Sequence, residues 1–211
     1  MIVVGLTGGL ASGKTEAARI FKKLGAHIFD ADAVARDLLK KGKPAYRGVV
    51  QIFGKEYLTP KGDIDRAKLA QRVFNSSKDL NKLNTLVHPG VIFECLRAIR
   101  RLKGRKGLLV LDVPLLFESH MERMADVTVV VRAKTATVHA RLAKKGVPRK
   151  LARAILASQW PVQRKVKLAD HVVDNDGTPA QLAKSVRAVR ERILRTKPEE
   201  LKRFYLNEGG N

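Results

Sequence analysis

The sequence contains very little cysteine and no long hydrophobic run. Cys95 is the single cysteine among 211 residues, which excludes an internal disulfide framework and favours a reducing compartment such as the cytoplasm. No stretch approaches the roughly 18 consecutive apolar residues that a membrane-spanning helix needs. Met1 is followed directly by Ile2–Val4, without the basic and long apolar regions of a signal peptide. We therefore expect a cytoplasmic protein without a membrane segment.

Acidic and aromatic residues are also scarce. The chain has 20 Asp and Glu against 42 Lys and Arg, a net charge of +22. Such an excess is typical of nucleic-acid-binding proteins, but also suits an anionic small substrate. Aromatic residues make up 5% of the chain, few for a surface that stacks on bases, and the densest basic run, Arg97–Lys106, has helical spacing. We interpret the charge as a solvated basic surface and do not expect nucleic acid to be the partner.

The sequence does have a regular alternation of strand-like and helical segments. Short, nearly continuous apolar runs, typical of strands covered on both faces, occur at residues 2–7, 27–29, 108–113, 127–131 and 171–173. Helical patterns occur at residues 15–24, 33–106, 134–168 and 179–195. Within them we expect a helix that begins after Asp65, a break near His88 and Pro89, and another at Gly146–Pro148. Strands alternating with helices predict an α/β fold with a five-stranded parallel sheet.

A glycine-rich loop follows the first expected strand. Residues 8–15 read Gly-Gly-Leu-Ala-Ser-Gly-Lys-Thr and match the phosphate-binding pattern G-x-x-x-x-G-K-[ST]. The glycines allow successive backbone N–H groups to point at phosphate oxygens, and the N-terminus of the following helix favours anions. In this pattern Lys14 reaches the β- and γ-phosphates and the Thr15 hydroxyl binds Mg²⁺. The loop predicts nucleotide binding but leaves the reaction open, since GTPases, ATPases and small-molecule kinases share it.

Two carboxylates, Asp30 and Asp32, follow the second expected strand. The carboxyl end of a parallel sheet is where ligands bind, so one of these carboxylates could orient or deprotonate an attacking hydroxyl. Alternatively, Asp32 could cap a helix that begins at Ala33. The residues alone leave both roles open.

Taken together, these segments resemble the dephospho-CoA kinase family. The resemblance begins with Gly5–Gly9, Ser12–Thr15, Phe29–Asp32 and Ala35–Arg36, and continues in order through Leu86–Pro89, Asp112–Glu118, Gln159 and Ala169–Gly177. It covers roughly residues 2 to 195. It implies a P-loop NTPase core with an inserted helical substrate domain and a helical lid. It also implies transfer of the γ-phosphate of ATP to the ribose 3′-hydroxyl of dephospho-CoA, the last step of coenzyme A synthesis.

The resemblance also implies how the chain is divided. Residues 1–32, 107–133 and 169–211 would form the P-loop core, residues 33–106 the helical acceptor domain, and residues 134–168 the lid over ATP. A lid excludes water and so limits wasteful ATP hydrolysis. We expect one compact kinase unit that is a monomer or a weak oligomer, with ATP, Mg²⁺ and dephospho-CoA as its small-molecule partners.

Carried over residue by residue, the resemblance implies roles for the site residues. Asp32 would be the general base that faces the acceptor hydroxyl, while Lys14 and Arg141 would stabilise charge on the transferring phosphoryl group. Thr15 and, through water, Asp112 would hold Mg²⁺. The other ATP-binding residues would be Gly9, Ala11, Ser12, Gly13, Glu16 and Asn175. The other acceptor-binding residues would be Arg36, His88, Pro114, Leu115 and Glu118. Without the resemblance, Arg141 reads as a solvated helix residue, His88 as a capping or core residue, and Asn175 equally well as part of an ordinary turn.

The sequence departs from the family pattern in three places. Leu10 and Ala11 replace the usual Ile-Gly, for which we expect a small effect provided that φ of Ala11 is negative. Lys144, Lys145 and Gly146 replace an Arg-Asp-Gly-like turn, and Ile155 replaces a basic or polar residue. The lid's second cation would then have to come from one of three residues: Lys145, Arg149 or Arg153.

Two rival interpretations remain. The first is another P-loop kinase, which phosphorylates a nucleoside monophosphate or a metabolite hydroxyl. The second is a basic P-loop protein that binds nucleic acid with a strong dependence on salt. A degenerate, non-catalytic relative is disfavoured because Lys14, Thr15, Asp32 and Arg141 are all present.

Overall fold

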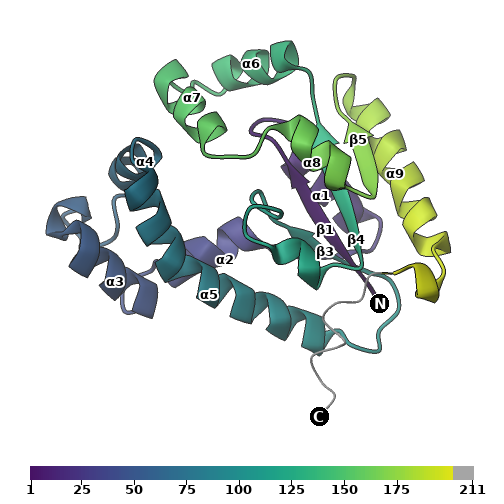
Figure 1. Ribbon diagram of the computed structural model, residues 1–211, viewed down its shortest axis with the longest axis horizontal. Helices are drawn as coiled ribbons and strands as arrows, with labels where there is room; N and C mark the ends of the chain where they lie inside the picture. Colours follow the sequence, from purple (N-terminus) through teal and green to yellow (C-terminus); the bar gives the residue numbers. More distant parts are fainter. Residues whose placement is uncertain (202–211) are drawn as a thin grey trace.

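The structure is a computed structural model that describes residues 1–201 of the chain. In this part of the chain, five parallel strands form one sheet in the order β2-β3-β1-β4-β5. Figure 1 labels β1, β3, β4 and β5. The strands are β1 (Ile2–Gly8), β2 (His27–Asp30), β3 (Leu108–Asp112), β4 (Val127–Arg132) and β5 (His171–Asp174). The predicted five-stranded parallel sheet is confirmed, and the carboxyl end of β1 lies in the middle of the edge where such sheets bind ligands.

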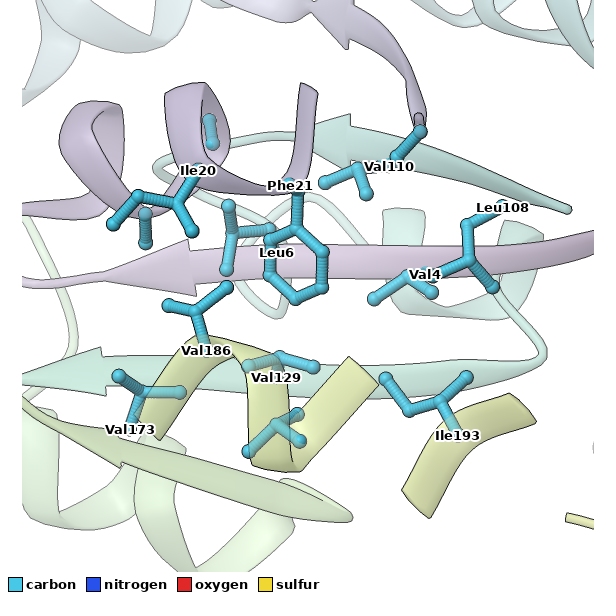
Figure 2. Close-up of a cluster of buried hydrophobic side chains, with 14 of the residues drawn as sticks. Val4, Leu6, Ile20, Phe21, Leu108, Val110, Val129, Val173, Val186 and Ile193 are labelled. Carbon is cyan, nitrogen blue, oxygen red and sulfur yellow. The ribbon is translucent and has the colours of Figure 1, made fainter. Parts of the chain in front are cut away.

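One face of the sheet is covered by α1 (Lys14–Lys23) and α9 (Pro179–Arg195). Figure 2 shows Phe21 of α1 and Ile193 of α9 on the same side of the sheet as Leu6 of β1. All three side chains are fully buried, and each such burial contributes roughly 1.5–3 kcal/mol. This core fixes β1 and α1, the two elements that the glycine-rich loop connects.

The opposite face of the sheet packs against α2 (Ala31–Leu38) and the long helix α5 (Ser77–Arg101). Val3 and Leu111 point to this face, where they share a buried cluster with Cys95 of α5. The strand residues that alternate with them, such as Val4 and Val110, face α1 and α9, as expected for strands with both faces covered.

The helices between β2 and β3 have a small core of their own. It lies among α3 (Pro44–Phe53), a single 3₁₀ turn η1 (Lys55–Tyr57) and α4 (Arg66–Phe74). The Asp65 carboxylate accepts a hydrogen bond from the Lys68 backbone N–H at 3.0 Å, which confirms the predicted start of α4. In Figure 1, α3 and α4 lie to one side of the sheet, beyond the far end of α5.

Three helices connect β4 to β5: α6 (Thr135–Lys144), α7 (Arg149–Ala157) and α8 (Val162–Leu168). The predicted break at Gly146 is present, and Gly146 has a φ of 65°. A second break, between α7 and α8, was not predicted. Pro161, the residue that precedes α8, is the sequence feature that could have indicated it. The 3₁₀ turns η2 (Met121–Met124) and η3 (Pro198–Glu200) complete the described elements.

The predicted break near His88 and Pro89 is wrong. Both residues lie inside α5, which runs without interruption for 25 residues. A proline removes one helical hydrogen bond, but buried residues on both sides of it, Val87 and Val91, hold the helix against the sheet. Within residues 1–201, neither α5 nor any other helix is long and apolar enough to cross a membrane.

Candidate active site

The glycine-rich loop occupies the turn between β1 and α1, and its neighbours leave no room for side chains at two positions. A Cβ on Gly8 would collide with the carbonyl oxygen of Val131 and with Ser12 Oγ. Gly13 has a φ of 96°, and a Cβ there would collide with Asn175 Nδ2. The first backbone N–H groups of α1, at Lys14 and Thr15, precede any intrahelical acceptor and so are available to an anion.

Ala11 has a φ of 57°, so the condition under which a small effect was expected does not hold. The left-handed conformation costs a non-glycine residue roughly 1–2 kcal/mol, because Cβ approaches the following carbonyl oxygen. The loop therefore adopts at Ala11 a shape that its sequence does not favour, and neighbouring contacts must stabilise that shape.

Arg141 and Asn175 supply such contacts from two other parts of the chain. Arg141 of α6 donates from Nη1 to the carbonyl oxygens of Ser12 at 3.1 Å and Ala11 at 3.3 Å, and from Nη2 to the carbonyl oxygen of Asn175 at 2.8 Å. The Asn175 side chain, which is buried, donates from Nδ2 to the Ser12 carbonyl oxygen at 2.7 Å. Arg141 therefore lies against the phosphate-binding loop and is not a solvated helix residue.

A group of charges gathers at the carboxyl ends of β1, β2 and β3. The Lys14 ammonium donates a hydrogen bond to the Asp112 carboxylate, which is 6% exposed at the end of β3. Burial raises the pKa of Asp112 above its ordinary value; the Lys14 charge acts in the opposite direction, and the charges of Asp30 and Asp32 reinforce the increase. The structure therefore brings Lys14 and three carboxylates within electrostatic reach of one another.

Asp30, rather than Asp32, caps the helix that follows β2. The Asp30 Oδ1 accepts a hydrogen bond from the Ala33 backbone N–H at 2.8 Å, and α2 begins at Ala31. Asp32 lies in the first turn of α2 and is exposed, so its carboxylate does not cap the helix and is accessible to a ligand. Arg36 Nη2 lies 3.9 Å from Asp30 Oδ2, at the edge of the same group.

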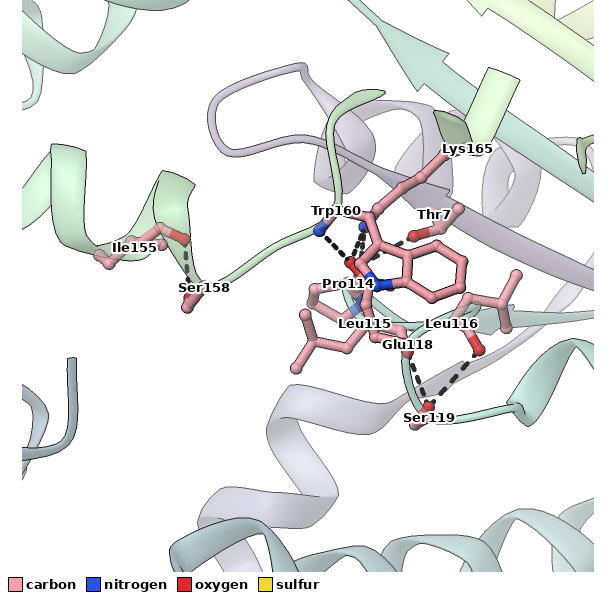
Figure 3. A network of polar contacts seen from close by, with 10 residues as sticks. All are labelled: Thr7, Pro114, Leu115, Leu116, Glu118, Ser119, Ile155, Ser158, Trp160 and Lys165. Atoms are coloured by element: carbon pink, nitrogen blue, oxygen red, sulfur yellow. Dashed lines mark hydrogen bonds and ion pairs between the residues drawn. The ribbon is translucent and has the colours of Figure 1, made fainter. Parts of the chain in front are cut away.

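The segment after β3 contacts Thr7, near the end of β1, and the start of α8 with the residue Trp160 before it (Figure 3). Thr7 Oγ1 and Lys165 Nζ donate to the carbonyl oxygen of Pro114, at 2.9 and 2.8 Å. The Glu118 Oε1 accepts from Lys165 Nζ and from the backbone N–H of Trp160, both at 2.8 Å. Lys165 is fully buried, and burial lowers its pKa although Glu118 acts in the opposite direction.

Sequence reasoning missed Lys165. The helix α8 has only seven residues, among them Arg164, Lys165 and Lys167, and no periodic pattern marks which of the three points inward. Their exposure distinguishes them, because Arg164 and Lys167 are exposed while Lys165 is buried. The three cations proposed for the lid, Lys145, Arg149 and Arg153, are all exposed.

Three other predicted residues lie on α5, on α1 and after β3. His88 is half-buried on α5, the helix that packs against α2, and burial lowers its pKa. Glu16 accepts a hydrogen bond from Arg19 at 3.2 Å on the outer side of α1. Leu115 is half-buried beside Pro114.

No three His, Cys, Asp or Glu side chains within residues 1–201 gather closely enough to form a metal site by themselves. Mg²⁺ does not require such a group, because it keeps waters and binds through one or two protein oxygens and substrate phosphates. Thr15, which is exposed at the start of α1, and Asp112 offer oxygen donors beside the loop. The donor set therefore fits Mg²⁺ bound together with a nucleotide.

Known proteins match nearly the whole chain. A family model described as dephospho-CoA kinase matches residues 2–181. A dephospho-CoA kinase of Carboxydothermus hydrogenoformans is 43% identical over 195 residues, with 91% of each chain covered.

Two solved structures resemble this fold. The crystal structure of TT1252 from Thermus thermophilus has a TM-score of 0.75 at 30% identity, with 91% of this chain and 97% of that chain covered. The dephospho-CoA kinase from Campylobacter jejuni has a TM-score of 0.66 at 23% identity, with 90% of this chain and 96% of that chain covered. At that identity, the second likeness shows the fold alone.

Proposed function

The chain belongs to the dephospho-CoA kinase family, which catalyses the final ATP-dependent step of coenzyme A synthesis, and from this premise we propose how its own residues carry out the transfer. The observation that carries the proposal is the group formed by Lys14, Asp112 and Asp32 beside the glycine-rich loop. It combines a cation for the phosphates with carboxylates for a hydroxyl and a metal ion, in the place where the sheet binds ligands.

The loop binds the phosphates of ATP. The backbone N–H groups of the loop, up to and including that of Thr15, surround the β- and γ-phosphates. The other residues of the ATP site are Gly9, Ala11, Ser12, Gly13 and Glu16. Ser12 Oγ is buried without a hydrogen-bond partner among the described residues, which supports a phosphate neighbour. Lys14 exchanges its bond to Asp112 for one to the γ-phosphate when ATP enters.

Mg²⁺, held by Thr15 and through water by Asp112, would neutralise charge on the phosphates when bound. Asp32 accepts the proton of the ribose 3′-hydroxyl as that oxygen bonds to the γ-phosphorus and the bond to ADP breaks. The exposure of Asp32, and the fact that Asp30 takes the capping role, support this assignment. Because phosphoryl transfer has a loose transition state, orientation of the hydroxyl is as important as removal of its proton.

Arg141 and Asn175 serve the nucleotide side. A guanidinium has five N–H groups, of which the described contacts of Arg141 use three at most. The others are directed to the transferring phosphoryl group, while the Asn175 turn contacts adenine. On the acceptor side, Arg36, His88, Pro114, Leu115 and Glu118 line the site for dephospho-CoA.

The division of the chain follows from these roles. Residues 1–32, 107–133 and 169–211 form the core, of which 202–211 lie outside the described residues; residues 33–106 bind the acceptor, and residues 134–168 form the lid. The contact between α4 and α7 supports a lid that meets the acceptor helices. We expect a cytoplasmic monomer or weak oligomer that binds small molecules and not nucleic acid.

The test is ADP release by the purified protein with Mg-ATP and different acceptors. Dephospho-CoA, AMP, dTMP, shikimate and no acceptor are compared side by side. Turnover with dephospho-CoA alone supports the proposal. Turnover with another acceptor overturns the substrate assignment, and salt-sensitive RNA or DNA binding without any turnover overturns the catalytic one.

A further inference from the structure

Lys165 is a fully buried lysine that the proposed phosphoryl transfer does not use. A buried ammonium is costly unless it is paired and hydrogen-bonded. Lys165 meets this requirement with two acceptors, Oε1 of Glu118 and the carbonyl oxygen of Pro114, each 2.8 Å from Nζ (Figure 3). The other contacts of these two acceptors show which parts of the chain Lys165 holds in place.

Both acceptors of Lys165 also bind other parts of the site. The Pro114 carbonyl oxygen accepts from Thr7 Oγ1 at 2.9 Å, and Thr7 is the residue before the glycine-rich loop begins. The Glu118 Oε1 accepts from the backbone N–H of Trp160 at 2.8 Å, where the lid segment leaves α7. Lys165 thus connects the strand that enters the loop, the acceptor-side segment 113–118 and the end of the lid.

The Glu118 carboxylate depends on this lysine. Its second oxygen, Oε2, is buried and has no hydrogen-bond partner among the described residues, so Lys165 is the cation that balances its charge. Lys165 also lies within electrostatic reach of Lys14, the loop lysine. Removal of the Lys165 ammonium would leave a buried carboxylate beside the acceptor segment without its charge partner.

We propose that Lys165 is a positioning residue for phosphoryl transfer, which holds segment 113–118 and the exit of the lid at fixed places relative to the glycine-rich loop. The inference rests on the proposed function. Without Lys165, the acceptor hydroxyl is misaligned with the γ-phosphate and the lid closes against a displaced segment. ATP binding itself, which depends on the loop and on Lys14, is preserved. The rate of phosphoryl transfer to the acceptor falls, so transfer to water becomes a larger share of the total ADP release.

Four variants separate positioning from folding. Lys165→Met removes the ammonium at similar length, and Lys165→Arg keeps the charge. A double variant that combines Glu118→Gln with Lys165→Met removes both charges, while the amide oxygen introduced at position 118 can still accept from the Trp160 N–H. Lys167→Met makes the same chemical change on the same helix at an exposed lysine and is the matched control.

For each full-length variant, the measurements are the melting temperature, the KM values for ATP and dephospho-CoA, and ADP release with and without acceptor. In Lys165→Met we expect the KM for dephospho-CoA and the ratio of acceptor-independent to acceptor-dependent ADP release to rise about tenfold or more, with the KM for ATP within about twofold. Lys165→Arg recovers the wild-type ratio to within a few-fold, and Lys167→Met matches the wild type.

The double variant is decisive if Lys165→Met folds poorly. We expect it to recover the melting temperature, because no unpaired buried charge remains, but not the ratio of acceptor-independent to acceptor-dependent ADP release. The KM for dephospho-CoA is compared only between Lys165→Met and the wild type, because Glu118 itself is placed on the acceptor side. Recovery of both the melting temperature and the ratio would show a purely structural role and overturn the proposal, as would an unchanged ratio in Lys165→Met. A wild-type protein without transfer to dephospho-CoA would instead refute the proposed function, so the two failures are distinguishable.

Discussion

The Arg141 guanidinium donates a hydrogen bond to the carbonyl oxygen of Ala11, the residue of the glycine-rich loop that has a positive φ without being glycine. The same nitrogen donates to the Ser12 carbonyl oxygen, which Asn175 also bonds. Contacts from α6 and from the turn after β5 therefore converge on Ala11, whose conformation its own side chain disfavours, and on the residue that follows it. The hydrogen bonds from these distant residues therefore stabilise a loop conformation that is strained at Ala11.

Replacement of Ala11 by glycine should stabilise the protein. Glycine adopts a φ of 57° without the clash of Cβ, although its greater freedom in the unfolded chain offsets part of the gain. We expect the free energy of unfolding to rise by up to about 1 kcal/mol, measured by urea unfolding. A lower stability of Ala11→Gly would contradict the presence of strain at this residue.

Replacement of Asn175 by alanine should weaken ATP binding, and less so when residue 11 is glycine. The variant loses the bond from Nδ2 to the Ser12 carbonyl oxygen, and the loop then relaxes away from its strained shape. We expect the KM for ATP to rise about tenfold in Asn175→Ala. In the double-mutant cycle with Ala11→Gly, the increase should be clearly smaller. Strictly additive effects would show that Asn175 does not stabilise the conformation of Ala11.

Replacement of Asp32 by asparagine should reduce kcat by about 10²-fold or more, the range of a general base, with little change in the melting temperature. Asp32 is exposed and does not cap α2, so folding does not require its charge. The matched control is Asp30→Asn, which should retain the cap and most of the activity, because the amide oxygen also accepts the Ala33 N–H. Activity of Asp32→Asn within a few-fold of the wild type would exclude the role of base.

Replacement of Lys14 by alanine should nearly abolish turnover, with a loss in kcat of roughly 10³-fold or more. The variant lacks the cation for the γ-phosphate and leaves the buried Asp112 without the ammonium that lowers its pKa. Steady-state assays with Mg-ATP and dephospho-CoA measure the loss. Undiminished turnover would mean that the loop does not bind the reacting phosphates.

The features that were predictable from the sequence are those that neighbouring residues determine. The five apolar runs, the glycine-rich loop and the cap at Asp65 all follow from patterns a few residues long. The features that were missed depend on contacts between distant parts of the chain. The positive φ at Ala11 occurs together with hydrogen bonds to Ala11 and Ser12 from residues 130 or more positions away in the sequence. Lys165 is buried only because Pro114 and Glu118 lie opposite α8.

At Pro89, contacts between distant parts of the chain override a local sequence signal. A proline that predicts a break remains inside α5, because burial of the helix against the sheet outweighs the loss of one backbone hydrogen bond. The roles of the site residues stay predictions, since proximity alone does not show what a side chain does.

Cys95 provides a probe of unfolding that does not involve the site. It is fully buried on α5 against the sheet, and burial raises the pKa of its thiol to about 12. The thiolate is the form that reacts with iodoacetamide, so the folded protein should be modified very slowly near neutral pH, and the unfolded chain much faster. Because ATP stabilises only the folded state, Mg-ATP should slow the modification further if it proceeds through global unfolding. Rapid modification of the native protein, or a rate that Mg-ATP leaves unchanged, would show that the contact between α5 and the sheet opens locally without unfolding of the core.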